Sequence, residues 1–328
     1  MPRSKKQKSF TGTEKSMKYA TSYRNGRGRN PPSTEDRHFV DPGEITILGV
    51  LDGHGGLAVV EHTHKHLSGK IRAHVVKSEG DENAICKGLA KLFHEHNEGL
   101  KAGGRIIHRD TGSTATIAII TAKSCIIAHI GDSPACIFDP EGKVLHTIRP
   151  HVPSNAEEKH RIEKNGGFVS NSKGDIPRVM GELAVSRAFG DFSLAPHVIC
   201  EPDIQVFPRP ERGYLALMSD GLIELPPTID NDDKGEIFKS IPDIAKNIAG
   251  AIQETRGDLP GAAELVLKRH VNESSGNEED YNGDDLTLII HDIGLGTKKL
   301  FNTSITRHKK GGGRRRGRTK KISGTFYI

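Results

Sequence analysis

Apolar residues along the chain fall into short β-branched runs and into longer segments with helical spacing. The short runs are typical of strands, and they cover residues 45–51, 112–121, 124–130, 135–139, 143–148, 204–208, 214–219 and 286–292. In the longer segments apolar residues recur every three or four positions, which predicts helices. These segments are residues 59–74, 82–100, 155–165, 237–256 and 259–272.

The order of these elements predicts the class of fold. Ala122-Lys123 separates two strands as a tight hairpin, and residues 140–142, Pro-Glu-Gly, separate the next two. Hairpin connections and paired helices disfavour a doubly wound parallel sheet. We therefore expect an α+β protein, an α/β/β/α sandwich in which two antiparallel sheets pack face to face with a helix pair outside each.

The composition argues against a membrane-bound or secreted protein. Hydrophobic residues make up 34% of the chain and aromatic residues 5%, and the apolar runs are too short to span a bilayer. The first residues contain no apolar segment, which argues against a secretory signal, and Pro2 argues against N-myristoylation. The four cysteines form no Cys-x-x-Cys pair. This pattern suits reduced thiols inside the cell and no membrane attachment.

Charge divides the chain into three parts. Residues 1–29 hold nine Lys or Arg and one acid, and residues 298–328 hold eleven Lys or Arg and no acid. The remaining residues 30–297 hold 27 basic and 41 acidic residues. We predict a basic N-terminal extension, a single acidic catalytic domain, and a Gly/Arg-rich tail that is disordered alone.

The two basic ends point to anionic partners rather than to chemistry. They suit an acidic protein partner, an import receptor or nucleic acid, although few aromatic residues are available for base stacking. We expect a monomer in the cytoplasm, the nucleus or both.

Carboxylates cluster beside strand ends and glycine turns. A single Asp-Gly is a common turn and weak evidence, but an ordered set of five acidic sites occurs along the chain. They are Glu35-Asp36, Asp52-Gly53-His54, Gly131-Asp132-Ser133, Ser219-Asp220-Gly221 and Asp284-Asp285. If the strands share one sandwich, these carboxylates meet at one rim and repel one another. Divalent cations with oxygen ligands, such as Mg²⁺ or Mn²⁺, would relieve that repulsion.

Several longer motifs in the same order give a specific resemblance. They are VLDGHGG (50–56), GSTA (112–115), HIGDS (129–133), LAVSRAFGD (183–191), MSDGL (218–222) and DDLTLII (284–290). Over residues 30–293 the chain resembles the PP2C (PPM) family of metal-dependent protein serine/threonine phosphatases. The resemblance implies hydrolysis of phosphoserine and phosphothreonine in phosphoprotein substrates by a water that bridges two metal ions.

The same resemblance implies a role for each matched residue. Asp52 would bridge both ions, with the Gly53 carbonyl on one of them and Asp220 and Asp284 on the other. Asp132 would join Asp220 at a third, weaker site.

The remaining matched residues would act around these ions. Glu35 and Asp36 would act mainly through metal-bound waters. His54 would be the general acid for the departing alkoxide, a task suited to histidine because its charge changes near neutral pH.

The sequence departs from the family pattern at supporting positions. Pro31 stands where the family places a phosphate-binding arginine, so Arg29 would reach the phosphate only through a bulge. Pro134 replaces an arginine, Pro150 an aspartate and Asp285 an asparagine. These changes bear on rate and specificity more than on the class of reaction.

Some alternatives remain open at this point. Arg187 is interpreted as a structural ion-pair partner, whereas Asp191 suits either a capping role or an outer metal role. A pseudophosphatase scaffold would lack ligands, and the principal ones are present here. A nucleic-acid or acidic-partner binding protein acting through the basic ends is the alternative from another class.

Overall fold

Two five-stranded antiparallel sheets form the centre of the molecule in the computed structural model, which describes residues 19–24, 34–102, 109–170, 176–225, 237–238, 240–275 and 284–295. The first sheet has the order β1 (Tyr19–Arg24), β17 (Leu286–Asp292), β14 (Tyr214–Met218), β8 (Ala135–Phe138) and β9 (Val144–Thr147). The second has the order β13 (Asp203–Pro208), β7 (Ser124–Ile130), β6 (Ala115–Ile120), β3 (Thr46–Leu51) and β2 (Arg37–Asp41).

The central strands are buried on both faces, which explains their continuous apolar sequences. In β3, Leu48 and Val50 face the first sheet and join the core between the two sheets. Ile47 and Leu51 point the other way, into the core beneath the helices. Because successive side chains of a strand alternate, one short segment contributes to two hydrophobic layers.

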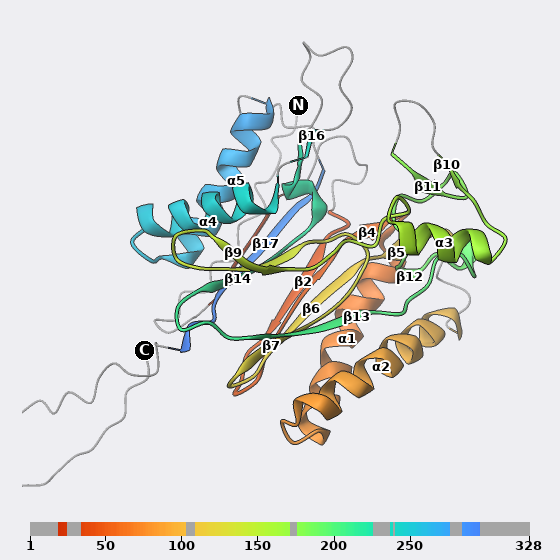
Figure 1. Ribbon diagram of the computed structural model, residues 1–328, viewed down its shortest axis with the longest axis horizontal. Coiled ribbons are helices and arrows are strands. Elements are labelled where there is room, and N and C mark those ends of the chain that lie inside the picture. The colour runs from red at the N-terminus through yellow and green to blue at the C-terminus, as the bar shows by residue number, and fades with distance from the viewer. Residues whose placement is uncertain are drawn as a thin grey trace, which may run out of the picture.

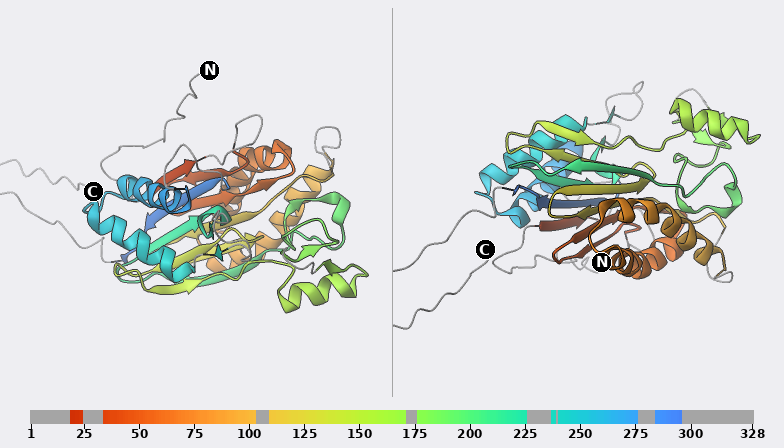
Figure 2. Two further views of the ribbon diagram at one scale, coloured as in Figure 1. Left: turned by 90° about the horizontal axis from the view of Figure 1, so that it is seen from above. Right: turned by 60° about the horizontal axis from the view of Figure 1, so that its bottom comes forward.

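A helix pair covers the outer face of each sheet. Helices α1 (Leu57–Lys77) and α2 (Glu82–Ala102) pack on the second sheet, and α4 (Ile241–Glu254) and α5 (Leu259–Ser275) pack on the first. Figures 1 and 2 show the two pairs on opposite sides of the sheets. The predicted α/β/β/α sandwich is confirmed. No helix among the described residues is both long enough and apolar enough to cross a membrane.

Helix α4 begins later than the sequence pattern predicts. Ile237–Phe238 form a short strand, β16, which pairs with β15 (Glu224–Leu225), so the predicted helix 237–256 was too long. The helix begins after Ser240, whose hydroxyl accepts a hydrogen bond from the Asp243 amide at 3.3 Å. Pro242 stands in the first turn, where its missing N–H costs nothing.

The first sheet includes residues that the charge pattern placed outside the domain. Strand β1 pairs with β17 in antiparallel register, from Tyr19 opposite His291 to Arg24 opposite Leu286. The predicted domain boundary at residue 30 is therefore too late. Its basic neighbours and polar composition hide β1 in the sequence. The described residues do not include Arg29, the rest of 1–29 outside β1, or the predicted C-terminal tail (298–328).

A smaller lobe projects from one end of the sandwich (Figure 1). It contains α3 (Ala156–Lys164), β10 (Val169–Ser170) and β11 (Arg178–Val179). Beside it run the short strands β4 (Gly53–His54), β5 (Gly112–Ser113) and β12 (Phe189–Gly190), and the 3₁₀ helix η1 (Phe192–Leu194). Ile162, Val179 and Val185 are among the residues that give the lobe its own small hydrophobic core.

Glu158 joins this lobe to the rest of the protein. Its buried carboxylate accepts hydrogen bonds from Arg187 Nε at 3.1 Å, Arg161 Nη2 at 2.8 Å and Ser186 Oγ at 2.7 Å. Arg187 in turn donates from Nη1 to Asp203 Oδ1 at 2.9 Å, at the start of β13. The predicted role of Arg187 as a structural ion-pair partner is confirmed.

Replacing Glu158 by glutamine should destabilise the fold in a pH-dependent way. Burial acts to raise the pKa of Glu158, but the hydrogen bonds from Arg187, Arg161 and Ser186 outweigh it and lower that pKa from 4.5 to about 2. The charged form therefore stabilises the folded state above pH 4.5, and this contribution is lost as the pH falls toward 2. At pH 7 we expect Glu158→Gln to lower the free energy of unfolding by about 3 kcal/mol.

Urea unfolding at pH 7 and pH 3 tests this, with Glu157→Gln as the matched control. Glu157 is exposed and pairs with exposed Arg149, so its loss should cost less than about 1 kcal/mol. The gap between parent and Glu158→Gln should narrow at pH 3. Equal effects of the two variants would contradict the role of Glu158. So would a difference in free energy of unfolding between parent and Glu158→Gln that is the same at both pH values.

Candidate active site

Strand register brings the predicted acidic residues to one end of the sandwich. Arg37 pairs with Leu51, which places Asp36 beside Asp52. In the other sheet Met218 pairs with Leu288, so the residues just after β14 and just before β17 share an end as well. The acidic positions, far apart in sequence, thus meet because the strands before or after them are antiparallel neighbours.

A cleft of about 460 Å³ lies at this end. It is lined by most of the predicted site residues together with part of the smaller lobe. The described lining residues are Glu35, Asp52, Gly53, His54, Gly55, Thr114, Asp132, Arg178, Leu183, Ala184, Val185, Asp220 and Asp284. Of the predicted ligands within the described residues, Asp36 alone is absent from this lining.

The backbone of Asp52 is fixed from both sides. Its amide donates to Thr114 Oγ1 at 3.1 Å, and its carbonyl accepts from the Thr114 amide at 2.8 Å. Thr114 Oγ1 lies 2.6 Å from Ser133 Oγ, which links this pair to the turn that holds Asp132. The hydroxyl pair therefore holds two of the predicted metal ligands in register with each other.

Gly53 and Asp285 hold the Glu35 segment against this site. The Gly53 amide donates to the Glu35 carbonyl at 3.2 Å, and a Cβ on Gly53 would lie 2.7 Å from that oxygen. The Glu35 amide donates to Asp285 Oδ2 at 2.9 Å. Asp285, which departs from the family pattern, thus anchors a neighbouring loop with its carboxylate.

Asp36 lies buried behind the cleft rather than in its wall. Its side chain is 4% exposed, and Thr287 Oγ1 donates to Asp36 Oδ2 at 2.7 Å. Burial raises the pKa of Asp36 to about 7, against the hydrogen bonds of Thr287 and Ser219, and the charges of Asp285 and Asp220 add to the rise.

Asp52 is the electrostatic centre of the group. Burial raises its pKa well above the usual value of 3.8, and the charges of Asp220, Asp36 and Asp284 raise it further. The side chains of Asp52 and Asp220 are also within hydrogen-bond reach of each other. Carboxylates so arranged cannot all ionise cheaply without a nearby cation. An all-oxygen donor set of this charge fits a hard divalent metal ion.

His54 and Asp191 form a pair at the edge of the cleft. His54 Nε2 lies 2.8 Å from Asp191 Oδ2 and 2.9 Å from Oδ1, and the Asp191 side chain is 3% exposed. Gly112 makes room for the contact, because a Cβ there would lie 2.0 Å from Asp191 Oδ2 and 2.4 Å from His54 Nε2. Sequence reasoning left Asp191 between capping and metal binding, and it missed this pairing.

Arg178 is a second residue that sequence reasoning missed. It belongs to β11 in the smaller lobe, lines the cleft, and donates from Nη1 to the Glu182 carbonyl at 3.2 Å. No motif marks it, since only the fold of the lobe brings it opposite the carboxylates. The predicted phosphate ligand, Arg29, lies outside the described residues.

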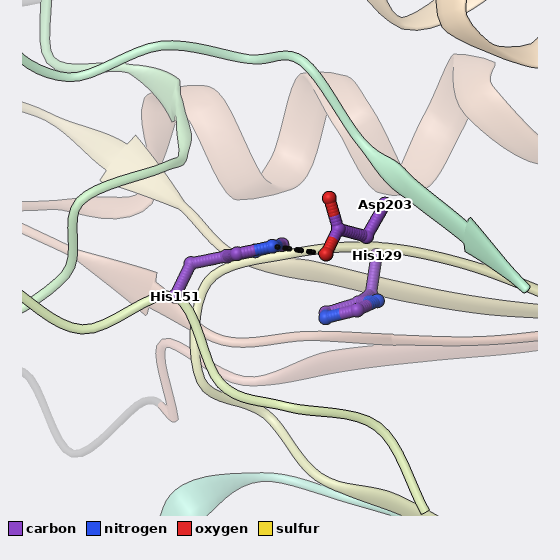
Figure 3. Close-up of side chains that lie close together, drawn as sticks. All are labelled: His129, His151 and Asp203. Carbon is purple, nitrogen blue, oxygen red and sulfur yellow. Dashed lines mark ion pairs between the residues drawn. The ribbon is translucent and has the colours of Figure 1, made fainter. Parts of the chain in front are cut away.

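A separate cluster, His129, His151 and Asp203, brings three possible ligand atoms within 4.8 Å of one another (Figure 3). None of the three is among the described residues that line the cleft. The rings are stacked, with centroids 4.4 Å and planes 9° apart, so their in-plane lone pairs do not converge. His151 Nε2 lies 3.3 Å from Asp203 Oδ2, and His129 Nε2 lies 2.9 Å from the Arg149 carbonyl. The cluster can hold a metal ion only if one ring turns.

Comparison with known proteins agrees with this geometry. The family model of protein phosphatase 2C matches residues 9–228. The "Probable protein phosphatase 2C 55" of Oryza sativa subsp. japonica is 32% identical over 285 residues, covering 84% of this chain and 73% of the relative. The "Probable protein phosphatase 2C 17" of Arabidopsis thaliana is 34% identical over 224 residues, covering 66% of this chain and 76% of the relative.

Solved structures show the same fold. The serine-threonine phosphatase 2C from Toxoplasma gondii superposes with a TM-score of 0.65 at 19% identity, covering 86% of this chain and 96% of that one. The fold, the acidic cleft and the family match together define a metal-dependent phosphohydrolase. The chain belongs to the protein phosphatase 2C family, and it is a protein serine/threonine phosphatase.

Gly112→Ala should damage the active site through sterics alone. The added methyl group would force Asp191 and His54 apart, and overpacking of this kind costs about 1–3 kcal/mol of stability. Phosphatase activity should fall as well. Gly69→Ala is the matched control, because nothing lies within 4 Å of its Cβ and alanine favours a helix. Chemical unfolding and turnover measure both variants, and equal behaviour would contradict the close packing at Gly112.

Proposed function

We propose that this phosphatase uses two divalent ions, Mg²⁺ or Mn²⁺, held by Asp52, Asp220 and Asp284 together with the Gly53 carbonyl. The observation that supports it is the carboxylate group around Asp52, whose pKa is raised by burial and by its acidic neighbours. Asp132, which lines the same cleft, is proposed to complete a weaker third site with Asp220.

When bound, the ions would supply positive charge that neutralises the phosphoryl oxygens and lowers the pKa of a water, so that this water loses a proton near neutral pH and can attack phosphorus. The chain's own residues set the geometry of that reaction. Thr114 and Ser133 keep Asp52 in place. Glu35 lines the cleft and is proposed to act through ordered water, whereas buried Asp36 acts through its charge on Asp52.

His54 is proposed to give a proton to the departing seryl or threonyl oxygen. Its Nε2 faces the Asp191 carboxylate at 2.8 Å, and this contact orients the ring. The proton for the leaving group would then come from Nδ1, the other ring nitrogen. Arg178 is placed to contact the phosphate or the peptide beside it, because a guanidinium suits phosphate oxygens.

The basic ends are proposed to address the enzyme rather than to take part in catalysis. Their 20 Lys and Arg residues suit an import receptor, an acidic partner or nucleic acid, in a salt-dependent way. We propose a nuclear, cytoplasmic or shared location on this basis. The alternative of a pseudophosphatase scaffold is not favoured, because acidic residues proposed as ligands, which such a scaffold would lose, line the cleft.

Asp52→Asn should abolish hydrolysis of a phosphothreonine peptide while the fold remains intact. The substitution removes the anion that is proposed to contact both ions. Parent activity should vanish in EDTA and return with Mn²⁺ or Mg²⁺ but not with Ca²⁺, whose looser geometry acidifies water poorly. Asp258→Asn, at an exposed position away from the cleft, is the matched control. Parent-level activity of Asp52→Asn at saturating Mn²⁺ would contradict the assignment.

His54→Ala should distinguish substrates by their leaving groups. A nitrophenolate departs without a proton, whereas an alkoxide needs one, so p-nitrophenyl phosphate should be hydrolysed at nearly the parent rate. Hydrolysis of the phosphothreonine peptide should fall about 100-fold or more. His66→Ala, at an exposed position on α1, is the control. Equal losses on both substrates would remove His54 from the acid role.

A further inference from the structure

A second cavity, which we call the side pocket, adjoins the catalytic cleft. Its volume is about 380 Å³. Three residues, Asp132, Ala184 and Asp220, line both the side pocket and the cleft. The two spaces therefore meet at the proposed metal ligands, and a group that enters one lies next to the other.

The side pocket is apolar where the cleft is acidic. Apart from the three shared residues, it is lined by proline, aliphatic and serine side chains. The remaining described lining residues are Ser133, Pro134, Ile148, Pro150, Val152, Ser154, Ile176, Pro177, Ile223 and Ile241. Among them none carries charge, so the shared aspartates supply the only charged wall in the described lining. Such a surface offers nothing to a phosphate and favours an aliphatic group.

The walls come from both parts of the molecule. Ile148, Pro150 and Val152 belong to the segment that leads from β9 to α3, whereas Ile176 and Pro177 precede β11 in the smaller lobe. Ile241 begins α4. The size is at the lower end of the range of about 300–1,000 Å³ for ligand pockets. It therefore suits a side chain rather than a length of peptide backbone.

We infer that the side pocket is a specificity subsite for a large aliphatic side chain within two residues of the phosphorylated serine or threonine. This inference rests on the proposed function of the cleft. Neighbouring Cα atoms are 3.8 Å apart, so a substrate whose phosphate lies at Asp52 and Asp220 carries its nearby side chains past Ala184. An extended peptide directs alternate side chains to the same side, which brings one of them to the side pocket.

The side pocket should make the enzyme prefer some phosphopeptides over others, although all of them carry the same phosphate. One aliphatic group in an apolar pocket typically changes kcat/KM about tenfold. This change in kcat/KM should depend on the peptide sequence and not on the phosphate. A substrate without a peptide, such as p-nitrophenyl phosphate, should be insensitive to the side pocket.

The experiment compares phosphothreonine peptides that carry leucine or serine at each position from −2 to +2. The full-length chain with Mn²⁺ should hydrolyse one leucine peptide with a kcat/KM about tenfold above its serine counterpart. Val152→Thr, which makes the wall polar at similar volume, and Val152→Phe, which fills the space, should each reduce this preference severalfold. Val206→Thr is the matched control, because Val206 is exposed on β13 and lines neither space.

Turnover of p-nitrophenyl phosphate separates the possible outcomes. If the parent fails to hydrolyse it with Mn²⁺, the proposed function fails. If the parent is active but shows no leucine preference, or if both Val152 variants keep that preference, the subsite is overturned. If the Val152 variants alter p-nitrophenyl phosphate turnover itself, the side pocket acts on the catalytic centre as a regulatory site, and the subsite is overturned as well.

Discussion

Repulsion among the buried carboxylates at one end of the sandwich is the constraint on which the site depends. Burial and acidic neighbours raise the pKa of Asp52. Burial also raises the pKa of Asp36, to about 7. Such a group is costly in a folded protein unless cations share its charge. The acidic segments lie at the ends of the most buried strands, where hydrogen bonds from hydroxyl and amide groups hold them close together despite this repulsion.

The sandwich and the site are linked by strand register. Each acidic segment directly follows or precedes a strand whose side chains fill two hydrophobic layers, so the core fixes where each carboxylate lies. The smaller lobe adds Arg178 and much of the apolar wall of the side pocket, and the Glu158–Arg187 pair ties that lobe to the sheet. An acidic cleft and an apolar pocket thus lie side by side, and different parts of the chain line them.

The central strands and the acidic motifs could be predicted from the sequence because their signals are local. An apolar run such as Ser124–Ile130 is recognisable as a strand from its own residues. Asp52-Gly53 directly follows another run of this kind. Strand β1 could not be found this way, since it is polar and its place depends on β17, far away in sequence. The contact of His54 with Asp191 and the position of Arg178 also require the folded chain, because neither has a sequence signature.

Thermal unfolding of the parent and of Asp220→Asn, each in EDTA and in saturating Mn²⁺, tests the central claim most directly. If carboxylate repulsion is relieved by cations, removing one charge should leave the metal-free protein as stable as the parent or more stable. Mn²⁺ should raise the Tm of the parent strongly and that of the variant little, so that the order of stability reverses. The account would be contradicted if Mn²⁺ left the Tm of the parent unchanged, or if Asp220→Asn were less stable than the parent in EDTA.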